Sequence, residues 1–169
     1  MITIRPLLAR DREQLFALVH MQDNFNPGEV AVAMEVIDDA LDPAKNDYTV
    51  LVAATETDTV AGFLCYGEIP LTDLRYDLYW IAVDPGKGRQ GVGSRLLAAM
   101  EARLGKQGPA RIYVDTSSTP GYKRARDFYE KNGYAAVCVL KDFYRDNDDR
   151  IIYMKKLPPL PAADKRNPA

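Results

Sequence analysis

The sequence WIAVDPGKGRQGVGSRLL, residues 80 to 97, decides the fold of this chain. An apolar run typical of a strand ends at Asp84-Pro85, a turn rich in glycine follows, and a segment with helical apolar spacing begins at Gly91. Backbone amides at the start of a helix have no partners within the helix and lie at the positive end of its dipole, so they stabilise anions. The pattern therefore predicts a strand, a phosphate-binding turn and a helix in direct succession.

Two familiar phosphate-binding motifs do not fit this turn. A Walker P-loop needs Ser or Thr after Gly-Lys, whereas Gly93 is followed by Ser94-Arg95. A dinucleotide-binding fold places its glycine turn after the first strand, with an acid about twenty residues further on. Here the turn follows the fourth predicted strand, and Lys87 and Arg89 supply positive charge close to it.

The segments on either side predict a mixed α/β domain over residues 1–157. The Pro- and Ala-rich residues 158–169 are expected to form a flexible tail. The expected strands cover residues 2–5, 48–55, 60–67, 76–83, 111–116, 134–140 and 150–157, and the expected helices begin near residues 11, 26, 91 and 120.

Local signals mark two helix starts and one loop. Asp11 is expected to cap the first helix by accepting a hydrogen bond from the amide of Gln14. Asn26, Pro27 and Glu29 have the spacing of a capping box with a first-turn proline. The acidic run of residues 142–149 is expected to be a solvated loop.

The amino-acid composition limits which binding partners and which cellular compartment we expect. The net charge of −2 gives no bulk attraction for nucleic acid or for an anionic membrane, so we expect neither as a partner. Cys65 and Cys138 lie in apolar strand-like runs, which predicts that both are buried and that the compartment is reducing. No leader or anchor pattern is apparent, so we expect a cytoplasmic location, and a homodimer is left open.

Two motifs carry a resemblance to a known family. Residues 83–85, Val-Asp-Pro, followed by RQGVGSRLL at 89–97, resemble the coenzyme-A-binding motif of the GNAT acetyltransferases. Further along, ARDFYEKNGY at residues 125–134 is similar to a second motif of that family. The resemblance implies the GNAT fold, a mixed and mostly antiparallel sheet of about seven strands flanked by about four helices, in the α/β (α+β) class.

The resemblance also implies acetyl-CoA as cosubstrate and a bulge after which the strand of residues 76–83 splays from its neighbour. Gly88 stands where the family usually has Gln or Arg, and Tyr122 where many members have Asn. The residues implied to bind the coenzyme are Ile81, Ala82, Val83, Lys87, Gly88, Arg89, Gln90, Gly91, Val92, Gly93, Ser94, Tyr122 and Arg126.

Acetyl transfer from a thioester needs a neutral amine, a polarised carbonyl and a proton for the departing thiolate. By resemblance, Tyr129 is the expected acid, and a phenol with a pKa of about 10 is protonated at neutral pH. The expected base is Asp77 or Asp115, with Glu68 in reserve. His20 is the only histidine, so we expect no metal.

These features predict direct acetyl transfer to a primary amine within a ternary complex, without a covalent enzyme intermediate. A small molecule is the favoured acceptor, ahead of a peptide or protein amine. Two alternatives are left open: a non-catalytic module that binds or senses acyl-CoA, and a partner-binding domain in which the glycine turn is only structural.

Overall fold

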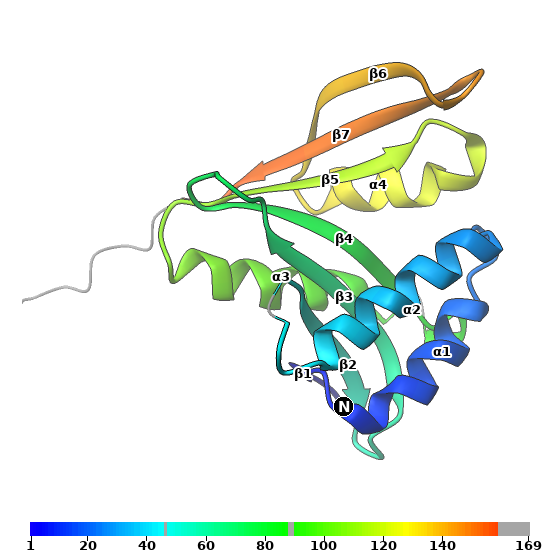
Figure 1. The fold of residues 1–169 in the computed structure, drawn as a ribbon, viewed down its shortest axis with the longest axis vertical. Helices are drawn as coiled ribbons and strands as arrows, with labels where there is room; N and C mark the ends of the chain where they lie inside the picture. Colours follow the sequence, from blue (N-terminus) through cyan, green and yellow to red (C-terminus); the bar gives the residue numbers. More distant parts are fainter. Residues whose placement is uncertain (46, 88–89, 159–169) are drawn as a thin grey trace, which may run out of the picture.

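A seven-stranded sheet runs through this computed structural model, which describes residues 1–45, 47–87 and 90–158 (Figure 1). The strands lie in the order β1-β2-β3-β4-β5-β7-β6, and all neighbours are antiparallel except β4 and β5. The strands are β1 (Ile2–Pro6), β2 (Thr49–Thr55), β3 (Val60–Glu68), β4 (Arg75–Val83), β5 (Arg111–Ser117), β6 (Ala135–Arg145) and β7 (Asp148–Lys156).

Helices cover both faces of this sheet and create two apolar cores. The helices are α1 (Arg12–His20), α2 (Pro27–Leu41), α3 (Val92–Gly105) and α4 (Lys123–Lys131). Because side chains alternate along a strand, Phe63 and Cys65 of β3 pack with α1 and α2, whereas Leu64 and Tyr66 belong to the core that α3 and α4 cover. The central strand β3 is therefore buried on both faces, and the predicted mixed α/β architecture is confirmed.

The fourth and fifth strands part after a short contact. β4 pairs with β5 only over Arg75–Asp77, opposite Arg111–Tyr113. A register shift on the other side of β4 leaves Tyr79 as a bulge against β3. Beyond this point the two ribbons diverge, as Figure 1 shows. The expected bulge and splay are thus both present, and they open the middle of the sheet.

Several local predictions are confirmed and others are wrong. The Asn26 and Glu29 side chains make the reciprocal capping box, at 3.0 and 2.7 Å. Cys65 is buried, but Cys138 is exposed on the edge strand β6. The run 142–149 is a β-hairpin rather than a loop, because β6 and β7 extend into it.

Three further observations complete the fold. Asp148, in the hairpin, is buried and accepts a hydrogen bond from Ser117 Oγ, so it does not attract ligands from solvent. Residues 159–169, where most of the predicted tail falls, lie outside the described residues. Within the described ranges, no helix is both long and apolar enough to cross a membrane.

The prediction that Asp11 caps α1 through its side chain is wrong. Its carboxylate is fully buried and accepts two hydrogen bonds from Arg5, at 2.6 and 2.8 Å, and one from the Leu8 amide at 2.9 Å. Burial alone raises the pKa of Asp11, but these hydrogen bonds outweigh it and hold the pKa below its usual value. Asp11 therefore ties the start of α1 to β1.

We expect Asp11→Asn to lower the free energy of unfolding by about 2 kcal/mol, because it removes a charged acceptor from a buried ion pair. Since the folded-state pKa is depressed, this stabilisation is present above the unfolded pKa of about 4 and is lost as the pH falls through the folded value. Urea unfolding of both proteins at pH 7 and near pH 3 measures it. A difference that is the same at both pH values would contradict this role.

Candidate active site

A cleft of about 770 Å³, called the large cleft below, lies where β4 has parted from β5. It is bounded by the α1–α2 loop, the end of β4, the start of α3 and one face of α4. Seven residues expected at the coenzyme or the acid position line it: Ile81, Ala82, Val83, Gly91, Gly93, Ser94 and Tyr129. Residues 81–94 and Tyr129, which are far apart in the sequence, thus meet at one cleft.

The start of α3 is open toward the large cleft. Gly91 is the N-cap residue, with a φ of 70°, and no side chain caps the helix. A Cβ added at Gly91 would meet no atom within 4 Å, so it would occupy free space. At Gly93 an added Cβ would come within 3.1 Å of the Phe128 ring. Gly91 thus leaves free space beside the first helical amides, which fits a diphosphate, whereas Gly93 makes room for the Phe128 ring.

Three other residues of the turn that were expected to contact the coenzyme are not among those that line the large cleft. Val92 is buried in the core, Gln90 is exposed, and Lys87 forms an ion pair with Asp84 at 3.4 Å. Gly88 and Arg89 lie outside the described residues.

Tyr122 and Arg126 have partners within the protein and are not among the described residues that line the large cleft. The Tyr122 hydroxyl donates to Glu29 Oε1 at 2.7 Å, and its oxygen lies 3.2 Å from the Asn24 carbonyl oxygen. Arg126 donates to the carbonyls of Ser117 and Thr119, at 2.6 and 2.9 Å. These bonds join the α1–α2 loop, the end of β5 and the start of α4.

Sequence reasoning missed part of the lining. The helical spacing of Gly121, Arg124, Ala125 and Phe128 places them on one face, which turns toward the large cleft. The spacing of these four residues along the chain is therefore enough to predict that they share a face. The loop of residues 21–25 lines the same cleft.

Tyr129 reaches the large cleft from within the core. Its side chain is 6% exposed, and its ring packs 6.0 Å from that of Tyr134 and 5.9 Å from that of Tyr153. Burial raises the pKa of Tyr129, and the negative charge of Asp115 raises it further. The phenol therefore keeps its proton throughout the neutral range and can act as a proton donor.

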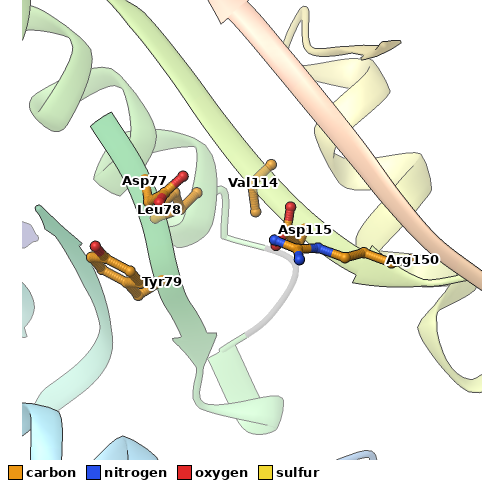
Figure 2. Close-up of a pocket in the computed structure, with 6 residues that line it drawn as sticks. All are labelled: Asp77, Leu78, Tyr79, Val114, Asp115 and Arg150. Atoms are coloured by element: carbon orange, nitrogen blue, oxygen red, sulfur yellow. The ribbon is translucent and has the colours of Figure 1, made fainter. Parts of the chain in front are cut away.

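A second hollow of about 200 Å³, called the small pocket, lies between β4 and β5 (Figure 2). Asp77, Leu78 and Tyr79 line it from β4, and Val114 and Asp115 from β5. Leu78 and Val114 belong to the α3-side core, so the adjacent carboxylates extend from the opposite face of the sheet. The structure thus brings together the two acids that the sequence offered as bases.

The two carboxylates have different surroundings. Asp115 forms an ion pair with Arg150 of β7. Asp77 has no hydrogen bond or ion pair among the described residues, and partial burial followed by the charge of Asp115 raises its pKa, although Arg150 opposes this. A carboxylate with a raised pKa is the better proton acceptor.

The described residues contain no group of three or more His, Cys, Asp or Glu side chains suited to a metal ion.

Comparisons with known proteins match this geometry. The family model described as "Acetyltransferase (GNAT) domain" matches residues 46–136. The crystal structure of a GNAT-family protein from Desulfovibrio desulfuricans is 38% identical in sequence, with a TM-score of 0.88, over 93% of this chain and 99% of that one. A search among curated proteins gives no match.

More distant structures share the fold. The ribosomal-protein-S18-alanine N-acetyltransferase of Escherichia coli is 22% identical over 99% of both chains, with a TM-score of 0.73. An aminoglycoside 6'-N-acetyltransferase complexed with coenzyme A is 20% identical, over 94% of this chain and 99% of that one, with a TM-score of 0.69. These two enzymes are named for different substrates, so the fold alone does not select an acceptor.

Proposed function

Because the chain belongs to the GNAT acetyltransferase family, we propose that it moves an acetyl group from acetyl-CoA to a primary amine. One observation carries this proposal. The strand β4 lines both hollows where it has parted from β5, the small pocket through Asp77 to Tyr79 and the large cleft through Ile81 to Val83. A donor bound in one hollow and an acceptor in the other can therefore meet at this point.

Acetyl-CoA supplies an activated acyl carbon and a thiolate leaving group. The first amides of α3, beside Gly91 and Gly93, are suited to hold its diphosphate. Arg124 and Lys131 line the same cleft and add positive charge. The edge of Ile81 to Val83 that faces away from β3 does not pair with β5, so its backbone groups can hold the extended arm and polarise the thioester oxygen.

Side chains from both hollows then accept and donate the protons of the reaction. Asp77, through water, takes one proton from the ammonium form of the acceptor. The neutral nitrogen bonds to the acyl carbon, and the carbon–sulfur bond breaks with its electron pair moving to sulfur. Tyr129 gives its proton to the sulfur and regains one from the nitrogen. The products are the N-acetylated amine and the free thiol, and Asp77 passes its proton to solvent.

The small pocket favours a compact acceptor. Its volume of about 200 Å³ suits a small amine or the end of a longer one. Its side-chain charges, from Asp77, Asp115 and Arg150, sum to one negative charge, which attracts an ammonium group. We therefore expect a small-molecule amine rather than a folded protein surface.

A broad amine panel tests the proposal against a non-catalytic acyl-CoA-binding module. With acetyl-CoA, the enzyme is expected to release thiol faster with at least one amine than without an acceptor, and mass spectrometry should find the acetylated product. Calorimetry with coenzyme A should give binding in both cases. Binding without thiol release across the panel would support the non-catalytic module, and the absence of binding would contradict both.

A further inference from the structure

The guanidinium of Arg150 is held between two neighbours in the small pocket. It donates from Nη2 to Asp115, and its Cζ lies 4.9 Å from the centre of the Phe143 ring. Its Nε atom is buried and has no hydrogen-bond partner among the described residues. Figure 2 shows this side chain extending from β7 to meet Asp115, with Asp77 across the opening on β4. The positive charge is thus fixed beside Asp115 in the lining of the small pocket.

Titratable groups surround Asp77 on its own strand and on three others. They are Glu68 on β3, Tyr79 on β4 itself, Tyr113 and Asp115 on β5 and Arg150 on β7, and Tyr144 on β6 is close to Asp115 and Arg150. Besides partial burial, Asp115 and Arg150 are the two groups that move the pKa of Asp77, the first upward and the second downward. The charge state of Asp77 therefore depends on a pair of residues from two other strands.

We propose that Arg150 is a positioning residue, which holds Asp115 in an ion pair so that Asp77 alone serves as general base. This inference rests on the proposed acetyl transfer. Two carboxylates that share a small hollow repel each other, and one of them then tends to retain a proton. Arg150 offsets the charge of Asp115 and leaves the Asp77 carboxylate, which has no partner among the described residues, in the lining of the small pocket.

Three substitutions separate this role from simple packing. Arg150→Met removes the charge and keeps the aliphatic stem, Arg150→Lys keeps the charge, and the double variant Arg150→Met with Asp115→Asn removes both members of the pair. Carbon-13 NMR of the aspartate carboxyls gives the titration midpoint of Asp77, with Asp77→Asn identifying its resonance. Thermal melts show whether each variant is folded.

In Arg150→Met the midpoint of Asp77 is expected to rise by about one pH unit. In the double variant it should return close to the wild-type value, because the repelling charge is gone as well, and Arg150→Lys should stay near wild type. An unchanged midpoint in Arg150→Met, or an equal rise in the double variant, would overturn the inference. If Arg150→Met does not fold, Asp115→Asn alone must lower the midpoint.

Kinetics distinguish failure of this inference from failure of the proposed function. With the best amine of the panel, the acidic limb of kcat/KM should follow the NMR midpoints across the variants. If the acidic limb of kcat/KM is the same in Arg150→Met as in the wild type, Arg150 has no role in the mechanism, and the proposed acetyl transfer still stands. Shifted midpoints with no acetylation of any amine by the wild type would instead refute the proposed function, and with it the role of Asp77 as base.

Discussion

Tyr129→Phe is expected to lower kcat about 10- to 1000-fold, while the Kd for coenzyme A changes by less than about twofold. The substitution removes only a hydroxyl, and the ring stays packed among its aromatic neighbours. Without this hydroxyl the departing sulfur must take its proton from water, so the effect falls on the chemical step. Steady-state thiol release and calorimetry measure the two quantities separately.

Tyr134→Phe is a matched control for this substitution. Tyr134 is also a buried tyrosine, its ring lies 6.0 Å from that of Tyr129, and its hydroxyl bonds to Glu101 rather than facing the large cleft. We expect it to retain nearly all of the wild-type kcat even if it costs some stability. Equal losses in the two variants would mean that Tyr129 acts through packing and is not the acid.

The parts of the site that the sequence predicted are those with local causes. A helix start depends on residues within one turn, so WIAVDPGKGRQGVGSRLL by itself predicted the strand, the turn and the helix around Gly91. The capping box of Asn26 and Glu29 is local in the same way, and it was also correct. The resemblance to the GNAT family supplied the splay of β4, which later appeared in the pairing.

The parts that the sequence missed depend on sheet order. Arg150 meets Asp115 only because β7 inserts between β5 and β6, and no spacing along the chain indicates that placement. For the same reason the sequence offered no basis for choosing between Asp77 and Asp115, although Asp115 is paired with Arg150 and Asp77 has no partner among the described residues. Asp11 was misjudged because Arg5, on the neighbouring strand, offers its carboxylate a charged partner that a helix amide cannot match.

Gly91→Val is expected to raise the Kd for coenzyme A at least about 100-fold, which is about 2.7 kcal/mol of binding free energy. Two physical effects add. A β-branched residue at a φ of 70° is strained, so the helix start must change its backbone. The new side chain also takes up the free space beside the first amides of α3, where a diphosphate would lie. Calorimetry with coenzyme A measures the change.

A pair of alanine variants separates these effects from damage to the helix. Gly105→Ala adds a methyl group at the other end of α3, where a Cβ likewise meets nothing within 4 Å and φ is not positive, so coenzyme affinity should not change. Gly91→Ala should weaken binding by about tenfold, because its strain is smaller than that of valine and its methyl fills less of the cleft. If both Gly91 variants bind coenzyme A as tightly as the wild type, the diphosphate does not lie at this helix start, and the assignment of the large cleft to acetyl-CoA fails.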